Sequence, residues 1–433
     1  MTQRVRHIVA VTAVLALTGL GGTAFAPAAA AQPVSHPAVV SENPAGFTPG
    51  VQDDTQTPDA TVNALLQRGS AMYAGGRFHT VTNSARTTTS QRDNLMAFDA
   101  RTGALAPFAP AIGSTGGVVW ALAASGPSLY VGGDFGTVAG KPHRALVKLD
   151  AVTGAVDPGF SAPIPSGRVT ELALTGNRLL VAGSFPKHLI ALDPATGSDT
   201  GYLNLGVSGS VATDSRPSEV YKFAVNPAGT RLMAIGNFTT VSGQSRPRAA
   251  MVDLGATATL DAWRYPPMAS RCAGSTLADQ LRDVDFSPDG SYFVIVASGF
   301  VVANSSQLGF TVCDAAARFD TANRAPSRPV WINYTGGDTL HSVAISGAAV
   351  YVQGHQRWLD NPKGKDSAGP GAVARQGIGA IDPKTGKALP WNPSKDRDVG
   401  GKDFLVTPAG LWVASDGRLF HGQPHWGIAF CPL

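Results

Sequence analysis

Two aspartates separated by a single residue have a spacing that could support chemistry. Asp283 and Asp285 fall in the segment DVDFSP at 283–288, where apolar and polar residues alternate. Alternating residues of an extended strand share a face, and paired carboxylates can bind a metal ion or act as acid and base. A salt-bridged structural lining explains the pair equally well, so both interpretations stay open.

Other charged and imidazole side chains fall where strands begin or where loops leave them. Arg77 and Asp134 occupy the variable position of a repeated Gly-X-Phe phrase, which is filled by Ser184 and Asn237 elsewhere. Such variation is typical of solvated turn residues. His341 begins an apolar strand. A histidine at such a position more often lines a channel with its side chain hydrogen-bonded than acts as a catalytic base. The candidate ligand-binding residues are Arg77, His79, Asp134, His143, Asp283, Asp285, Asp338, His341, His355, Lys402 and Asp403.

No sequence motif assigns a reaction to these residues. The chain contains no HExxH, GxSxG or phosphate-binding GxxxxGK[ST] pattern. The three cysteines match no metal-binding spacing. We therefore expect no catalytic residues, no metal ion and no cofactor.

The elements that must hold the candidate residues repeat along the chain. The phrase SLYVGGDFGTVAG at 128–140 recurs as SAMYAGGRFHTVT at 70–82 and TRLMAIGNFTTVSG at 230–243. In every copy a turn glycine separates two short apolar strands, and successive glycines lie roughly 50–63 residues apart. These glycines are Gly69, Gly126, Gly176, Gly229, Gly290, Gly347 and Gly410.

Several copies continue with a third strand that ends in an aspartate turn. LMAFDARTG at 95–103 and LVKLDAVTG at 146–154 share an apolar strand, then Asp, then Thr-Gly. The carboxylate can accept backbone N–H groups two residues on, and glycine tolerates the positive φ of the turn. A weaker fourth strand follows, marked by Pro and an aromatic residue, as in DPGFSAP at 157–163.

Seven such units predict an all-β fold, a seven-bladed β-propeller of four-stranded antiparallel blades. A lone four-stranded sheet cannot bury both faces, and a period near 50 with short hairpins favours a propeller over a solenoid. The last copy stops after its third strand at 427–433, while NPAGFTPGV at 43–51 resembles DPGFSAPI at 157–164. We expect the N-terminal segment to complete the last blade, rather than form a free tail, because closure removes an exposed sheet edge.

The repeats resemble the delta-60 repeat, a β-propeller repeat of secreted actinobacterial proteins with the pattern YVGGxFxxVxGxxRxxLAxLDxxTG. The resemblance covers nearly the whole chain after the N-terminal segment, with looser matches in the last three copies. It implies an architecture and carries no catalytic residues. The best copy matches at Tyr130, Gly132, Gly133, Phe135, Val138, Gly140, Arg144, Leu149, Asp150, Thr153 and Gly154.

In such a propeller, the loops between second and third strands share one face with the connections between blades, and ligands commonly bind there. The longest of these loops are predicted at 78–93, 237–248, 299–312 and 355–374. Cys272 and Cys313 would reach the same face, and we expect them to form a disulfide in an oxidising compartment. Cys431 lies in an apolar final strand and is expected to be a buried, inert thiol.

The N-terminus predicts a signal peptide. Arg4 and Arg6 precede an apolar stretch at 8–20, and the small residues at 28–31 fit a cleavage site. We expect a signal peptide at 1–31, an N-terminal segment with the closing strand at 32–61, and the propeller at 62–433. The protein would then be secreted, with no membrane partner.

Charge argues against a nucleic-acid partner. The formal net charge of +4 falls to +2 without Arg4 and Arg6, and no basic cluster is present. The sequence predicts a secreted, monomeric, non-catalytic binding or scaffold protein whose ligand is a small molecule, a cell-wall glycan or another secreted protein. The alternative is a propeller enzyme, such as a quinoprotein-like dehydrogenase or a lyase or glycosidase. It would require Asp283, Asp285, His341 and Asp403 to point into one channel site.

Overall fold

A computed structural model describes residues 34–113, 116–212, 214–273, 279–397 and 400–433. The signal peptide predicted at 1–31 lies outside these residues. Within them the chain is all-β apart from one short 3-10 helix, η1 (Pro266–Ala269), and the strands form many small antiparallel sheets. No helix among the described segments is long and apolar enough to cross a membrane.

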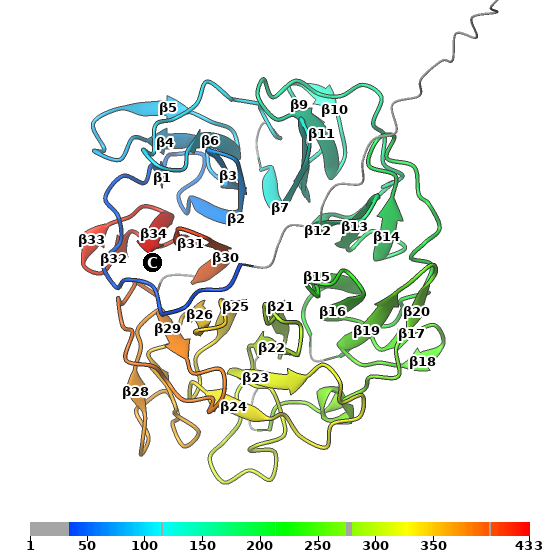
Figure 1. Cartoon of the computed structure of the whole chain (residues 1–433), viewed down its shortest axis with the longest axis vertical. Coiled ribbons are helices and arrows are strands. Elements are labelled where there is room, and N and C mark those ends of the chain that lie inside the picture. Colours follow the sequence, from blue (N-terminus) through cyan, green and yellow to red (C-terminus); the bar gives the residue numbers. More distant parts are fainter. Residues whose placement is uncertain (1–33, 114–115, 213, 274–278, 398–399) are drawn as a thin grey trace, which may run out of the picture.

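Seven sheets in the described residues repeat one strand order, and Figure 1 shows them arranged around a common centre. In each, an inner strand pairs with a second strand, which pairs with a third. The first four sheets are β2 (Thr61–Arg68), β3 (Ala71–Arg77) and β6 (Leu95–Asp99); β7 (Val118–Ser125), β8 (Ser128–Asp134) and β11 (Leu146–Asp150); β12 (Val169–Thr175), β13 (Arg178–Gly183) and β14 (Leu189–Leu192); and β15 (Glu219–Val225), β16 (Arg231–Asn237), β19 (Ala249–Leu254) and β20 (Ala258–Leu260). The remaining three are β21 (Leu281–Phe286), β22 (Tyr292–Ala297), β23 (Ala315–Asp320) and β24 (Trp331–Tyr334); β25 (Leu340–Ile345), β26 (Val350–Gly354) and β29 (Ile378–Ile381); and β30 (Gly401–Thr407), β31 (Gly410–Ser415) and β34 (Ile428–Pro432).

The predicted fourth strand is regular in only two of these sheets, where it is β20 or β24. In four others the same position is reduced to an isolated antiparallel bridge: Phe98 to Leu105, Leu149 to Val156, Leu192 to Asp199 and Ile381 to Ala388. The Pro and Gly residues of this segment explain the difference, because proline cannot donate to a ladder and glycine weakens a strand.

The N-terminal segment runs beside the last sheet. Ser41 N donates to Pro432 O and Ala45 N donates to Phe430 O, both at 2.8 Å, so the segment lies along the outer edge of β34. A short strand of this segment, β1 (Gly50–Gln52), pairs with β4 (Thr80–Thr82), which in turn pairs with β5 (Thr89–Gln91). The segment therefore contacts both the last sheet and a loop of the first.

Small hairpins fill several loops that follow the second strands. They are β9 (Thr137–Val138) with β10 (Lys141–Pro142), β17 (Thr240–Val241) with β18 (Gln244–Ser245), β27 (Trp358–Leu359) with β28 (Val373–Ala374), and β32 (Leu419–Phe420) with β33 (Gln423–Pro424). Between β9 and β10 both turn residues, Ala139 and Gly140, have positive φ values of 49° and 76°. A two-residue turn of this kind matches the twist of its strands.

The repeated sequence phrases form the predicted local structures. The carboxylate of Asp150 accepts N–H groups from Val152 (3.0 Å) and Thr153 (2.7 Å), as expected for the aspartate turn. In the Gly-Gly pair, a Cβ atom on Gly133 would lie 2.1 Å from the carbonyl oxygen of Val118. The second glycine thus allows the first and second strands to approach closely, and the Gly-Gly pair is structural.

The hydrophobic core lies between neighbouring sheets. Buried residues of the fourth and fifth sheets, for example, form one continuous cluster that includes Met233, Trp263 and Phe293. Phe293 and Phe319 stack with their ring centroids 5.5 Å apart. Each sheet therefore buries both faces against its neighbours, which leaves the inner edge of each first strand as the surface that faces the centre.

Candidate functional site

Each of the seven inner strands contains one β-bulge, at the same place near its start. In β21, Leu281 and Asp283 oppose adjacent residues of β22, so Arg282 is the extra residue. A bulge breaks the strict alternation of side chains and re-aims the extra residue. The inner strands begin beside the ends of the second strands, so the bulges lie near the face where the long loops leave the sheets.

The seven extra residues line one cavity of about 200 Å³ in the described structure. One side chain comes from each inner strand, and most of them can donate a hydrogen bond. We call this set the bulge ring: Asn63, Trp120, Thr170, Tyr221, Arg282, His341 and Lys402.

Three consecutive inner strands make one side of the bulge ring basic. Arg282, His341 and Lys402 come from β21, β25 and β30. Burial, together with the positive charges of Arg282 and Lys402, holds the pKa of His341 well below its usual range. Burial also lowers the pKa of Lys402, an effect that Arg282 reinforces and Asp416 opposes. His341 is therefore a neutral imidazole at physiological pH.

Two donors of the bulge ring have no protein partner. Trp120 Nε1 and His341 Nε2 are both buried and make no hydrogen bond within the described structure. By contrast, Asn63 Nδ2 donates to Val119 O at 3.1 Å and Thr170 Oγ1 donates to Val220 O at 3.1 Å, which ties each to the next inner strand. The ring thus combines anchored residues with donors that point at no acceptor of the protein.

A second cavity, of about 460 Å³, lies further along the inner strands. Its lining includes the residue that directly follows the bulge in six of the seven strands: Ala64, Ala121, Glu171, Lys222, Asp283 and Asp403. Lys222 Nζ lies 2.6 Å from Glu171 Oε2. We call this set the acidic level, because its other charged members are carboxylates and Asp285 lies beside them.

The aspartates of the acidic level bond to backbone amides. Asp283 Oδ2 accepts from Val343 N at 2.9 Å and Asp285 Oδ2 accepts from Ile345 N at 2.8 Å. Asp403 Oδ2 accepts from Leu65 N at 2.9 Å. Each carboxyl group therefore caps an amide on the exposed edge of the next inner strand. This is a structural role, but it differs from the salt-bridged lining that the sequence suggested beside metal binding and acid–base chemistry.

Burial raises the pKa of all three carboxyl groups, to about 8 for Asp283, about 7 for Asp285 and about 6 for Asp403. The backbone amides and, for Asp283 and Asp403, the nearby Lys222 ammonium oppose this shift. No group of three or more His, Cys, Asp or Glu side chains in the described residues could hold a metal ion.

The sequence candidates divide between these two cavities and the periphery. Asp283, Asp285 and Asp403 lie together in the acidic level, and His341 and Lys402 lie in the bulge ring. The two cavities share Trp120 and Lys222, so these five residues do line one continuous region.

The other candidates serve the loops. Asp338 is buried and bonded to Arg357 and Arg397, at 2.9 and 3.1 Å. His79 is buried with its Nδ1 3.2 Å from Asp93. Arg77 pairs with Asp59 at the surface, Asp134 is exposed at the end of β8, and His143 is half-buried beyond β10. The ring of His355 lies 5.1 Å from that of His341, which places it beside the bulge ring.

Sequence reasoning missed five members of the bulge ring and two of the acidic level: Asn63, Trp120, Thr170, Tyr221, Arg282, Lys222 and Glu171. The signal is present as a break in alternation: in β21 the buried residues Leu281 and Val284 are three positions apart instead of two. The same spacing of buried residues occurs in β15, from Val220 to Phe223.

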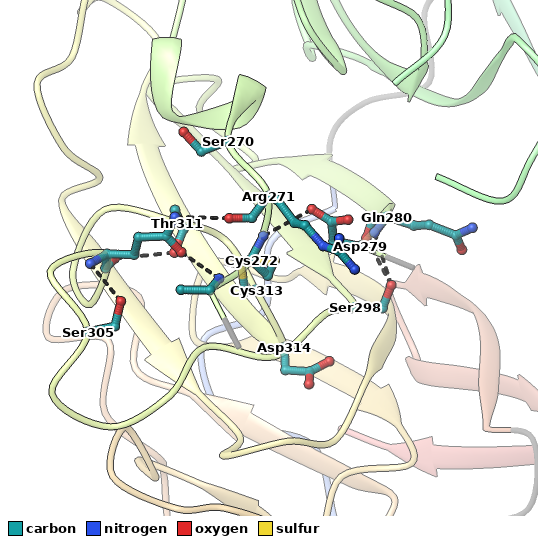
Figure 2. Close-up of a disulfide and its surroundings, with 12 residues drawn as sticks. Ser270, Arg271, Cys272, Asp279, Gln280, Ser298, Ser305, Thr311, Cys313 and Asp314 are labelled. Carbon is teal, nitrogen blue, oxygen red and sulfur yellow. Dashed lines mark hydrogen bonds between the residues drawn. A yellow bond between two sulfur atoms is a disulfide. The ribbon is translucent and has the colours of Figure 1, made fainter. Parts of the chain in front are cut away.

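The predicted disulfide joins Cys272 and Cys313, whose Cα atoms lie 6.0 Å apart (Figure 2). Beside it, Asp279 Oδ2 accepts from Cys272 N at 3.2 Å and from Arg248 Nη2 at 2.9 Å. The disulfide thus ties the loop that precedes the fifth sheet to the loop that precedes β23. Cys431 is a buried free thiol, and burial raises its pKa, as expected for an inert thiol.

The repeated antiparallel sheets around a common centre define an all-β architecture of the propeller kind. Residues 128–160 match a family model described as "Domain of unknown function (DUF5122) beta-propeller". This stretch is the copy that fits the repeat pattern best. The comparison with curated proteins finds no match.

Two solved structures are similar to this chain at low sequence identity. The structure of YCF48 bound to D1 peptide has a TM-score of 0.50 and 10% identity, covering 92% of this chain and 97% of that one. The computationally designed Ika8 protein gives a TM-score of 0.46 and 12% identity, covering 89% and 98%. Likeness at this level of identity concerns the fold alone.

Proposed function

We propose that this chain is a secreted, seven-bladed β-propeller that binds a ligand at the bulge ring, where the channel opens toward the long loops. The observation that carries the proposal is the convergence of seven side chains, one from each inner strand, on one cavity. Buried donors without partners are costly to a fold, because each loses its bonds to water. A ligand that supplies acceptors would remove this cost.

The ring closure in this proposal is supported by contacts between the two ends of the chain. Asp403 of β30 caps Leu65 of β2, so the last inner strand lies against the first. Phe47 packs against Trp412 and Phe430, with ring centroids 6.0 and 5.8 Å away. The N-terminal segment would thus supply the outer element that the last sheet lacks.

Secretion is supported by the signal-peptide pattern at 1–31 and by the Cys272–Cys313 disulfide, since disulfides persist in oxidising compartments. The delta-60 resemblance is consistent with this location. Recovery of the protein from culture medium, with Gln32 as its first residue, would support the assignment; retention in the cytoplasm with an intact N-terminus would contradict it.

The ligand class in this proposal is a glycan, a small molecule or a protein segment, and the protein acts without catalysis. The acidic level supports the binding role, because its aspartates already accept backbone N–H groups. The solved structure of YCF48 bound to D1 peptide is an instance of a similar fold with a peptide ligand.

The direct test is a ligand screen with residues 32–433, using thermal shift and the fluorescence of Trp120. A ligand at a hundred times its dissociation constant should stabilise the protein by about 2.7 kcal/mol. Trp120→Ala should abolish a shift that arises at the bulge ring, whereas the exposed Val152→Ala should leave it unchanged. A ligand whose binding survives Trp120→Ala but requires an intact outer loop would place the site elsewhere and contradict the proposal.

A further inference from the structure

We propose that the bulge ring is an oxyanion site, so that the ligand of this protein inserts a carboxylate, sulfate or phosphate group into it. This inference rests on the proposed function and names the chemistry of the group that enters the cavity. The geometry that leads to it is the placement of Arg282, His341 and Lys402 side by side on β21, β25 and β30, all three lining the same cavity.

The cations of the bulge ring are not neutralised by the protein. Among the described residues Arg282 makes one hydrogen bond, from Nε to the neutral Ser298 Oγ at 3.3 Å, and neither Arg282 nor Lys402 forms an ion pair. An unpaired cation away from bulk water is unfavourable. Two such cations facing one small cavity would be strongly stabilised by an anion between them.

The carboxylates around the ring do not fill that role. Asp214 is engaged by Arg216, at 2.7 Å. Burial and the nearby Asp338 raise the pKa of Asp314 well above its usual range, against the opposing charge of Arg282, so this carboxyl group gives up its proton less readily than an ordinary aspartate. Asp416 directly follows β31 and its charge raises the pKa of Lys402, but it lies outside ion-pair distance, and its Oδ1 accepts from Gly400 N at 3.1 Å.

The remaining donors complete a binding site for oxygen atoms. Trp120 Nε1 can only donate, and the neutral imidazole of His341 can present an N–H at Nε2. Both atoms are buried without a partner. Charge-assisted bonds from such donors and from a guanidinium are the strong class of hydrogen bond. The cavity of about 200 Å³ restricts the inserted group to a small one.

The first experiment measures binding of three probes by Trp fluorescence and calorimetry at constant ionic strength: glucuronate, sulfate and inorganic phosphate. Glucose and the methyl ester of glucuronic acid are the neutral controls. We expect at least one oxyanion to bind and both neutral sugars to bind at least tenfold more weakly, since a hydrogen bond to a charged group is worth about 1.5–3 kcal/mol. Which probe binds tells a sugar carboxylate from a sulfate or phosphate group.

The variants Arg282→Gln and Lys402→Gln should each weaken that binding at least tenfold. Arg101→Gln is the control, because Arg101 is an exposed residue in the turn after β6 and lines neither cavity. Arg101→Gln should leave the affinity unchanged. Without ligand, Lys402→Gln should melt no lower than the unsubstituted protein, because it removes a half-buried charge that forms no ion pair among the described residues. This keeps the test valid for a folded variant.

The pH dependence of affinity is a second, independent measurement. Arg77, Arg282, His355, Lys395 and Asp416 are the charged or titratable groups whose charge acts on His341 or Lys402. A bound anion favours protonation of both His341 and Lys402, so affinity should rise as the pH falls from 8 to 5.

Binding of a neutral sugar or peptide at Trp120 with no response to any oxyanion would overturn the oxyanion inference and leave the proposed function intact. Oxyanion binding that survives both Arg282→Gln and Lys402→Gln would also overturn it. Failure of every ligand, neutral and anionic, would count against both.

Discussion

At the scale of single residues, the aspartates near the centre of the molecule accept hydrogen bonds from backbone N–H groups that have no neighbouring strand. An inner strand has no neighbour on its central edge, so its N–H groups face the channel. Asp283 and Asp285 of β21 cap Val343 and Ile345 of β25, and Asp403 of β30 caps Leu65 of β2. A pair of carboxylates on one face of a strand can therefore mean satisfied edge amides, with no reaction attached.

The raised pKa values of these carboxyl groups predict how stability depends on pH. Each carboxyl binds a proton more readily in the folded protein than in the unfolded chain, where its pKa is near 3.8. Folding therefore takes up protons, and the free energy of unfolding falls as the pH rises toward about 8. The pKa of His425 is lowered to about 4 and acts in the opposite direction below pH 6.5, so urea unfolding should be compared at pH 6.5 and 8.5.

Asp283→Asn should reduce this loss of stability between pH 6.5 and 8.5. The exposed Asp134→Asn is the control and should keep the dependence of the unsubstituted protein. Equal urea midpoints at both pH values for the unsubstituted protein would contradict the assignment of protonated carboxyls to the acidic level.

The Gly-Gly pair makes a second prediction at this scale. Gly133→Ala would place a Cβ atom 2.1 Å from Val118 O, so the two strands must separate or distort. Overpacking of this kind costs about 1–3 kcal/mol. Gly136→Ala, three residues later, meets no atom within 4 Å and is the matched control. Thermal unfolding should show a large loss for Gly133→Ala and little change for Gly136→Ala; equal losses would refute a steric role.

At the scale of elements, the repeat pattern predicted most of the strands and turns, because each copy contains its own apolar strand residues and turn residues. The Asp150 turn was predicted from side-chain capping. The two-residue turn at Ala139-Gly140 was not predicted, and there Ala139 as well as Gly140 has a positive φ. The fourth strands were overestimated, since an apolar residue beside Pro and Gly supports one bridge but no ladder. The bulges escaped prediction because a single extra residue changes the direction of a side chain without changing composition.

The disulfide gives a prediction for the loops around it. Removing it by Cys272→Ser with Cys313→Ser frees a sequence separation of 41 residues, for which chain entropy sets an upper figure of about 4 kcal/mol. We expect a lower melting temperature under non-reducing conditions and the same effect from a reductant on the unsubstituted protein. Cys431→Ala should not reproduce the response to reductant. A double variant that melts with the unsubstituted protein would contradict a stabilising role.

At the scale of the whole molecule, the contacts of the N-terminal segment predict that the stability of the last sheet depends on residues outside the repeats. His36 Nε2 lies 2.8 Å from Thr407 O, Ser41 and Ala45 bond to β34, and Phe47 packs on Trp412. A chain that begins at residue 53 loses all of these contacts and should melt markedly lower than one that begins at residue 34. Equal melting temperatures, or an equal rate of proteolysis in the last sheet, would show that the segment is dispensable.

The centre of the molecule also separates basic from acidic side chains along its axis. The bulge ring carries Arg282 and Lys402 toward the long loops, and the acidic level carries Asp283, Asp285 and Asp403 further along the inner strands. The candidate residues of the acidic level could be predicted from alternation within one strand. Their assembly with residues more than 100 positions away could not, because it depends on the order of sheets around the ring.

The bulge that recurs in every inner strand has a consequence for how such a protein changes over generations. Each member of the ring is one residue in its own repeat, and the β-bulge directs its side chain toward the cavity. The bulge needs no particular residue type, since Asn63, Trp120, Thr170 and Lys402 all occupy this position. Exchange of one repeat for another by recombination would replace one residue that lines the cavity and keep the bulge that directs its side chain. In the proposed binding protein, the ligand specificity of the bulge ring can therefore change one inner strand at a time, while the packing between sheets is kept.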